Sequence, residues 1–236
     1  MTTTASEQYL VAICTLIDER RPPTLAQLAA YCGVTQPTMG EAARKLEREG
    51  LIRVVPRRTI ELTEQGRTIA DTLLRRHRLV ERWLTDALGL DWATAHEEAH
   101  RLEHAISPLV EERLAASLGY PETCPHGNPI RPLTPEERAT PLVALSEVPL
   151  GSEVRLRRIS ELAEDDRELL LFYERHGFRP GVRIRVRERG PLNGPLIVDV
   201  DGREVAIGVE AAAFLWVWPP AEAATAGQGA TQQAVA

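Results

Sequence analysis

The residues best suited to metal chemistry are histidines and glutamates in two short stretches, which hold four of the six histidines. On a helix, residues three and four positions apart share a face. Those at such spacings are His77 and Glu81 in the first stretch, and His96, His100, Glu103 and His104 in the second. Imidazole and carboxylate are the usual protein ligands of divalent transition metals. The spacing therefore predicts one or two metal sites between two helices.

Two other interpretations of these stretches stay open. A helix rich in glutamate and histidine is often only a solvated face. In addition, His96-Glu97-Glu98-Ala99-His100 matches the H-E-x-x-H pattern of zinc peptidases, in which two histidines bind zinc and the glutamate is the general base. A five-residue match arises easily by chance, so the surrounding sequence must decide between a metal site of another kind and a zinc metallopeptidase.

Composition favours a globular protein of two or three small domains, with 236 residues, 43% hydrophobic and 26% charged. No apolar run reaches the ~20 residues that span a bilayer, and the first residues lack the pattern of a signal peptide. Cys14, Cys32 and Cys124 are widely spaced, which fits free thiols in a reducing compartment. We therefore expect a cytoplasmic protein.

Charge is unevenly distributed along the chain. The net charge is −6, but residues 1–80 hold 12 Lys and Arg against 9 Asp and Glu, while the remainder holds 16 against 25. A slightly basic N-terminal part on an acidic body is compatible with a DNA-binding domain attached to a regulatory body.

The first fifty residues predict three short helices. The first covers about 6–19, the second starts at the capping box of Thr24, and the third starts at Thr35 and ends near Gly50. Gly33 suits a tight turn between the last two, which is a helix-turn-helix pattern. The third helix would enter the major groove of DNA with its N-terminal residues nearest the bases. The expected contact residues are Thr35, Gln36, Pro37, Thr38, Gly40, Glu41 and Arg44.

Residues 51–62 predict a β-hairpin with Arg57 and Arg58 at its tip. A hairpin after a helix-turn-helix is a wing, and arginines at its tip would contact phosphate. A helical protein-interaction module is the alternative for this region.

Beyond residue 145 the sequence predicts a small β domain. Apolar and polar residues alternate at 154–156 and 182–186, as in half-buried strands. Asn193-Gly194 and Asp201-Gly202 are turn signals.

Residues from Thr63 to about Gly89 predict a long helix. A winged helix, this long helix and a histidine-rich helix, in this order, resemble the diphtheria toxin repressor (DtxR) family of metal-dependent transcription regulators. The match is close through about residue 132 and looser through about 218. The segments that carry it are Gln36-Pro37-Thr38, Leu62-Thr63-Glu64-Gln65-Gly66-Arg67, residues 76–82, residues 96–107 and Pro125-His126-Gly127-Asn128-Pro129-Ile130.

The resemblance implies two metal sites. The primary site would use Gln8, His100, Glu103 and His104, and an ancillary site would use His77, Glu81, His96, Glu161 and Glu164. Iron-type members carry Met and Cys at the positions of Gln8 and His100, and manganese-type members carry Asp and Glu. This chain has neither pair. Without a sulfur ligand, the primary site has no preference for soft metals. Mn(II) or Fe(II) is favoured, Co(II), Ni(II) and Zn(II) remain compatible, and Glu7 could replace Gln8.

The expected fold is mainly α with small β parts. It comprises a winged helix-turn-helix at 1–73, a helical metal-binding and dimerisation domain with its linker at 74–140, an SH3-like β-barrel at 145–218 and a disordered tail at 219–236. The expected function is a metal-activated, homodimeric repressor that binds double-stranded DNA operators of metal homeostasis genes and catalyses no reaction. The alternatives are a zinc metallopeptidase, which the resemblance disfavours because it places His96 and His100 in different sites, and a metal-independent DNA-binding protein.

Overall fold

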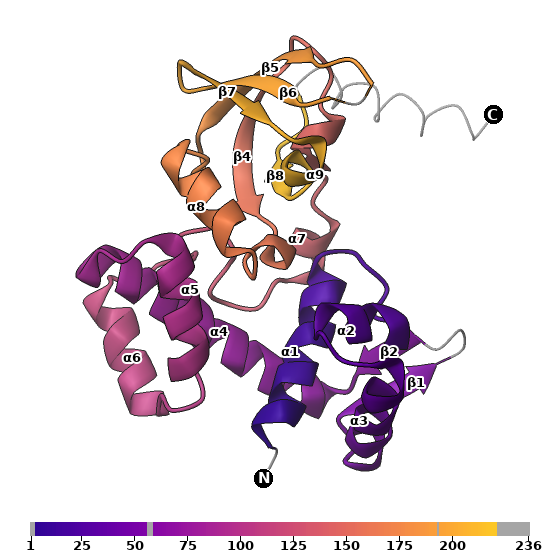
Figure 1. Ribbon diagram of the computed structural model, residues 1–236. Helices are drawn as coiled ribbons and strands as arrows, with labels where there is room; N and C mark the ends of the chain where they lie inside the picture. Colours follow the sequence, from indigo (N-terminus) through magenta and orange to yellow (C-terminus); the bar gives the residue numbers. More distant parts are fainter. Residues whose placement is uncertain (1–2, 56–58, 193, 221–236) are drawn as a thin grey trace, which may run out of the picture. The chain divides into compact units, whose positions relative to one another are not determined.

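The computed structural model describes residues 3–55, 59–192 and 194–220 (Figure 1). The chain divides into two compact units. The first contains residues up to 90 together with 94–124 and 129–138, and the second contains 91–93, 125–128 and the chain from 139 onward. Within the described ranges, no helix is both long and apolar enough to cross a membrane.

The first unit begins with a winged helix-turn-helix, as the sequence predicts. Its elements are α1 (Thr4–Asp18), α2 (Leu25–Tyr31), α3 (Gln36–Arg48), β1 (Ile52–Val55) and β2 (Thr59–Leu62). Each helix begins after a threonine whose side chain accepts a hydrogen bond from the backbone of the first turn: Thr3, Thr24 and Thr35. Gly33, with φ 64°, ends α2 in the left-handed conformation that glycine adopts without strain.

The wing is an antiparallel hairpin that pairs Ile52 with Leu62 and Val55 with Thr59. Its predicted tip residues, Arg57 and Arg58, lie outside the described residues, so their contact with phosphate stays a prediction. The hydrophobic centre of this region is formed by the fully buried side chains of Leu10, Ile13, Leu28, Met39, Leu46, Leu51, Ile52 and Ile60.

A long helix, α4 (Glu64–Leu88), leaves the wing and leads to α5 (Trp92–Leu102) and α6 (Pro108–Ser117). A Cβ on Gly66 would lie 2.0 Å from the carbonyl oxygen of Leu51, so only glycine allows the start of α4 to approach the wing this closely. α4 and α5 pack together through Val80, Leu84, Ala95 and Ala99. The first unit ends at Arg138, the last residue but one of the short helix α7 (Pro135–Ala139).

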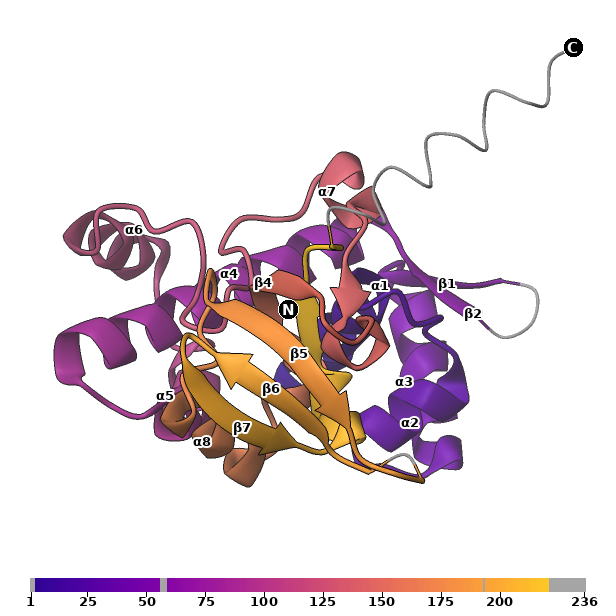
Figure 2. The same ribbon diagram turned by 90° about the horizontal axis from the view of Figure 1, so that it is seen from above.

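The second unit is an antiparallel sheet in the order β3-β8-β4-β5-β6-β7, and Figure 2 shows β5, β6 and β7 side by side. Its strands are β3 (Val143–Ala144), β4 (Glu153–Ile159), β5 (Arg183–Arg189), β6 (Leu196–Val200), β7 (Arg203–Ile207) and β8 (Leu215–Val217), with helices α8 (Arg167–Arg175) and α9 (Val209–Ala212). Ile184 and Val186 are buried while Arg183, Arg185 and Arg187 are exposed, which is the predicted alternation.

The turn between β6 and β7 is formed by Asp201 and Gly202, both with positive φ, as the Asp-Gly signal predicts. These elements confirm the expected fold class, with a helical N-terminal part and a small SH3-like sheet after it. Asn193 and residues 221–236 lie outside the described residues, so the predicted disorder of the tail stays a prediction.

Candidate metal centre

A dense group of histidine and glutamate side chains, of the types that can bind metal, lies between α4 and α5 in the first unit. The Nδ1 atom of His77 lies 2.7 Å from Oε2 of Glu103, and its Nε2 atom lies 3.0 Å from Oε1 of Glu81. The same Glu81 oxygen is 2.8 Å from Nδ1 of His96. His77, Glu81, His96 and Glu103 are all buried, so their polar atoms depend on one another for partners.

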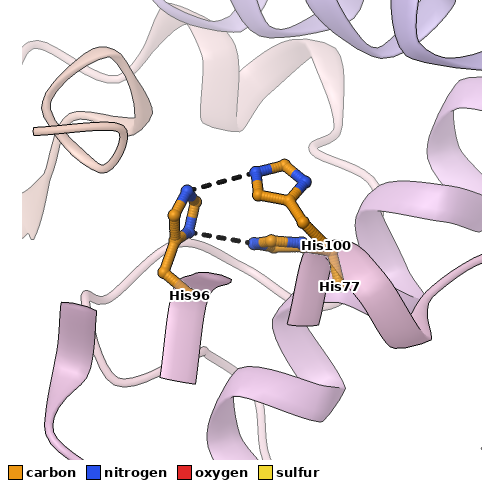
Figure 3. Close-up of side chains that lie close together, drawn as sticks. All are labelled: His77, His96 and His100. Carbon is orange, nitrogen blue, oxygen red and sulfur yellow. Dashed lines mark hydrogen bonds between the residues drawn. The ribbon is translucent and has the colours of Figure 1, made fainter. Parts of the chain in front are cut away.

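Three imidazoles meet in this group, and we call His77, His96 and His100 the imidazole cluster (Figure 3). The Nε2 atom of His77 is 3.2 Å from Nδ1 of His96, and Nε2 of His96 is 3.2 Å from Nε2 of His100. One ring nitrogen can be taken from each residue so that all three lie within 4.8 Å of one another. The side chain of His100 is 45% exposed, so the cluster is open to solvent on that side.

A second set of donors continues from the cluster to α1. Oε1 of Glu103 is 3.2 Å from Nε2 of His104, and Nδ1 of His104 is 3.0 Å from Oε2 of Glu7. We call Glu7, Glu103 and His104 the α1 end of the network. Glu7 belongs to the first turn of α1, so this contact connects the winged helix with the turn that follows α5.

The α1 end differs from the set expected from the sequence. Helix α5 ends at Leu102, and Ala105 N–H donates to the carbonyl of Leu102 in a turn, so the helical face assumed through His104 is not continuous. His104 therefore meets α1 while His100 turns toward His96. The side chain of Gln8 is exposed, and its neighbour Glu7 contacts His104 instead.

Glu161 and Glu164 belong to the second unit, and their part in a metal site stays a prediction. Within that unit, Glu164 accepts a hydrogen bond of 2.7 Å from the side-chain amide of Asn128 and lies 3.1 Å from Nδ1 of the fully buried His126. Glu161 is buried at the start of a short 3-10 helix.

The carboxylates of the network favour a positive charge on the imidazole of His77. Burial opposes the charged imidazole of His77, but the charge of Glu81 and the hydrogen bonds with Glu103 and Glu81 outweigh it, so the pKa of His77 lies well above its usual value. Burial would likewise raise the pKa of Glu103, but its contacts with His100 and His77 outweigh burial and hold the pKa at about 2.

The donor set fits a divalent transition metal. Imidazole nitrogens and carboxylate oxygens converge in a buried region, which is the ligand chemistry of Mn(II), Fe(II), Co(II) and Zn(II). Glu97, the candidate base of the peptidase pattern, is exposed on α5 while the neighbouring His96 is buried. His96 faces two imidazoles and Glu81, so its surroundings are those of a ligand within a larger network.

The proposed DNA contacts share one exposed face of α3. Six of these residues are exposed, namely Thr35, Gln36, Pro37, Thr38, Glu41 and Arg44, and Gly40 is half-buried. On the other side of the helix, Met39, Ala43 and Leu46 point into the core.

Helix α3 also makes a contact with α1 that residue spacing did not predict. Nζ of Lys45 lies 3.3 Å from Oγ of the buried Ser6, the residue before Glu7. No sequence signal identifies this contact, because the two residues are 39 positions apart.

Three known protein families match successive segments that together cover nearly the whole chain. Residues 1–60 match the family described as "Iron dependent repressor, N-terminal DNA binding domain", residues 63–132 "Iron dependent repressor, metal binding and dimerisation domain", and residues 143–219 "FeoA domain". The iron-dependent repressor IdeR of Mycobacterium tuberculosis is 39% identical over 208 residues, which cover 84% of this chain and 90% of IdeR.

The diphtheria toxin repressor of Corynebacterium diphtheriae is 31% identical over 209 residues, covering 86% of this chain and 91% of the relative. Among solved structures, a manganese-dependent transcriptional repressor in complex with manganese superposes with a TM-score of 0.78 at 32% identity, covering 91% of this chain and 99% of the other. The chain belongs to the diphtheria toxin repressor family of metal-dependent transcriptional repressors.

Proposed function

We propose that this chain is a metal-activated transcriptional repressor that binds operator DNA of metal homeostasis genes as a homodimer. The observation that carries the proposal is the contact between Glu7 of α1 and His104, which joins the DNA-binding region to the metal-binding group. Residues 1–73 would bind DNA, 74–140 would bind metal and a second copy, and 145–218 would support the ancillary ligands. Such a protein acts where the DNA is, so we assign it to the cytoplasm.

Activation would depend on the α1 end. A bound divalent cation would supply the positive charge that attracts Glu7, Glu103 and His104 to one point. These residues would then hold the first turn of α1 to the turn after α5. Because α1 packs against α2 and α3, a fixed α1 restricts the motion of the recognition helix. A recognition helix that is already restricted loses less conformational entropy on binding DNA, which raises its affinity.

The α1 end offers two carboxylates and one imidazole, a donor set that favours Mn(II) or Fe(II). Gln8 remains a candidate ligand from the family pattern, but its exposed position makes Glu7 the better supported one. The ancillary site would combine His77, Glu81 and His96 with Glu161 and Glu164 of the second unit.

Dimerisation is supported by apolar side chains exposed around α6. Leu109 is 68% exposed and Val110 46%, and Leu102 at the end of α5 is 37% exposed. Neighbouring exposed apolar residues on a soluble protein are characteristic of an interface. A second copy that covers them would place two recognition helices on one operator, as paired half-sites require.

The proposal is tested by measuring DNA affinity at matched free concentrations of Mn(II), Fe(II), Co(II), Ni(II) and Zn(II) without oxygen. The duplex would be selected from a random library by the metal-loaded protein. We expect at least one of the first two metals to raise affinity for the selected duplex. Equal affinity with and without every metal would instead establish a metal-independent DNA-binding protein.

The peptidase alternative is tested with Glu97→Gln. A peptidase needs this carboxylate as its base, so the variant would lose any cleavage of a peptide library by the zinc-loaded protein. A repressor keeps its metal-dependent DNA binding in the same variant. Cleavage by the unaltered chain that disappears in Glu97→Gln would contradict the proposed function.

A further inference from the structure

The C-terminal end of α1 carries a carboxylate that its own helix does not neutralise. Asp18 is the last residue of α1, where the backbone carbonyl groups form the negative end of the helix dipole, and the last turn contains no basic residue. The side chain of Asp18 is only 8% exposed, so water offsets little of its charge. A carboxylate in this position needs cationic partners from other elements.

One partner of Asp18 comes from α4 and is shared with a second carboxylate. Nη2 of Arg67 lies 3.4 Å from Oδ1 of Asp18, while Nε of the same guanidinium lies 2.9 Å from Oδ1 of Asp71. Two negative charges therefore share the single positive charge of Arg67. A second cation beside Asp18 balances them.

Arg138, at the end of the first unit, supplies this second cation. Its Nε atom donates a hydrogen bond of 2.9 Å to Oδ1 of Asp18, which is 120 positions away in the sequence. Its backbone carbonyl accepts a hydrogen bond of 3.1 Å from Nη2 of Arg20, two residues beyond Asp18. Arg138 is thus held at the end of α1 through both its side chain and its backbone.

Local contacts keep α7 formed around Arg138. The backbone N–H of Glu137 donates to Oγ1 of Thr134, and the backbone N–H of Thr134 donates to the side chain of Glu137, which is a capping box. Arg131 donates hydrogen bonds to both side-chain oxygens of Glu137. A helix of five residues is not stable in water by itself, so these contacts shape the segment and the contacts with α1 fix its position.

The position of α7 shortens the free part of the connection to the second unit. Because β3 begins at Val143, only residues 139–142 lie between Arg138 and this strand. With α7 released, the free chain would begin after Ile130, the last buried residue before α7. At ~3.3–3.6 Å per extended residue, the reach of the connection would grow from roughly 17 Å to roughly 45 Å.

We propose that Asp18 and Arg67 form an anchoring site for α7, which attaches the linker to the winged helix through Arg138. The second unit is then connected to the DNA-binding region by four residues instead of a long flexible linker. The anchoring contacts join guanidinium groups to carboxylates and need no metal. They hold the C-terminal end of α1, whereas the contact of Glu7 with His104 holds the other end.

Digestion of the metal-free, full-length protein with a protease specific for glutamate tests the anchor. Cleavage after Glu136 or Glu137 requires α7 to open, so its rate follows the population of the open segment. Arg138→Gln removes the cation beside Asp18 and should accelerate this cleavage ~5-fold or more, with the cut identified from fragment masses. Arg138→Lys keeps the charge and should restore part of the protection. The matched variant Arg187→Gln breaks an arginine–aspartate contact in the second unit and should leave the rate unchanged.

A double-mutant cycle separates the contact with α1 from an effect on α7 alone. Arg138 lies in the last turn of α7, where a cation also stabilises the helix itself. If the contact with Asp18 protects α7, Arg138→Gln should change cleavage little in a protein that already carries Asp18→Asn. Effects of the two changes that add independently would overturn the anchor. Equal cleavage rates in the unaltered chain and in Arg138→Gln would also overturn it, and that comparison does not depend on the stability of Asp18→Asn.

Discussion

The two ends of the donor network use the same ligand chemistry but connect different parts of the molecule. The imidazole cluster draws its ligands from α4 and α5, which already pack through Val80, Leu84, Ala95 and Ala99. The α1 end crosses from the turn after α5 to Glu7 of the winged helix. A metal bound between helices that are already packed together changes their relative motion little. A metal that joins two separate elements changes their coupling, so we expect regulation to reside at the α1 end.

The largest effect is expected for His104→Ala. This change removes the one imidazole of the α1 end and with it the ligand opposite Glu7. Metal-activated DNA binding should fall to the level of the metal-free protein, measured by fluorescence anisotropy with a labelled duplex. His176→Ala is the matched control, because that imidazole belongs to the second unit and contacts the carbonyl of Phe172. Full activation in His104→Ala would remove the α1 end from the mechanism.

Adjacent residues of α1 provide the next comparison. Glu7→Gln should lose most of the metal-dependent gain in DNA affinity, because an uncharged amide is a weaker ligand than a carboxylate. Gln8→Ala should retain most of the gain, because Gln8 is exposed. Calorimetric metal titrations of the two variants measure the same difference without DNA. The reverse order would restore Gln8 as the ligand, as the family pattern implies.

A smaller effect is expected for His77→Ala. The change removes one ligand of the imidazole cluster but leaves Glu7, Glu103 and His104 in place. The metal concentration for half-maximal DNA binding should rise severalfold while the maximum is kept. His77 is buried between two carboxylates, so thermal unfolding of the metal-free variant serves as the folding control. Loss of activation as complete as in His104→Ala would abolish the distinction between the two ends.

The smallest effect is expected for Lys45→Met, which removes the hydrogen bond from α3 to Ser6 beside Glu7. One hydrogen bond of this kind contributes about 0.5–1.5 kcal/mol, so the ratio of metal-loaded to metal-free DNA affinity should fall roughly 2- to 10-fold. Because Lys45 could also attract phosphate, the ratio is the informative quantity. If Ser6→Ala and Lys45→Met reduce the ratio independently, their contact does not contribute to coupling.

Much of the fold could be predicted because the ends of helices and the faces of strands are determined by residues close together in the sequence. Thr24, Thr35 and Ser107 begin helices where their side chains can cap them, and Gly33 and Gly89 end helices in the left-handed conformation. The buried and exposed faces of β5 follow directly from alternation. These features depend on neighbouring residues and need no knowledge of distant contacts.

The arrangement of the metal donors could be predicted only in part. Spacing indicates which side chains share a helical face, and it brought His77 together with Glu81. It could not indicate that α5 ends at Leu102, because neither glycine nor proline follows at once. It also could not choose between Glu7 and Gln8, which differ by about 100° around α1, because that choice depends on how α1 packs against distant elements.

Reciprocal coupling between metal and DNA is the most direct test of the α1 end. Metal affinity of the full-length protein would be measured by calorimetry with and without saturating operator duplex, and in His104→Ala. If metal acts by joining Glu7 to His104, DNA must raise metal affinity by the same factor by which metal raises DNA affinity. In His104→Ala both factors should fall to about one. A metal affinity that DNA does not change, or coupling that survives in His104→Ala, would contradict regulation through the α1 end.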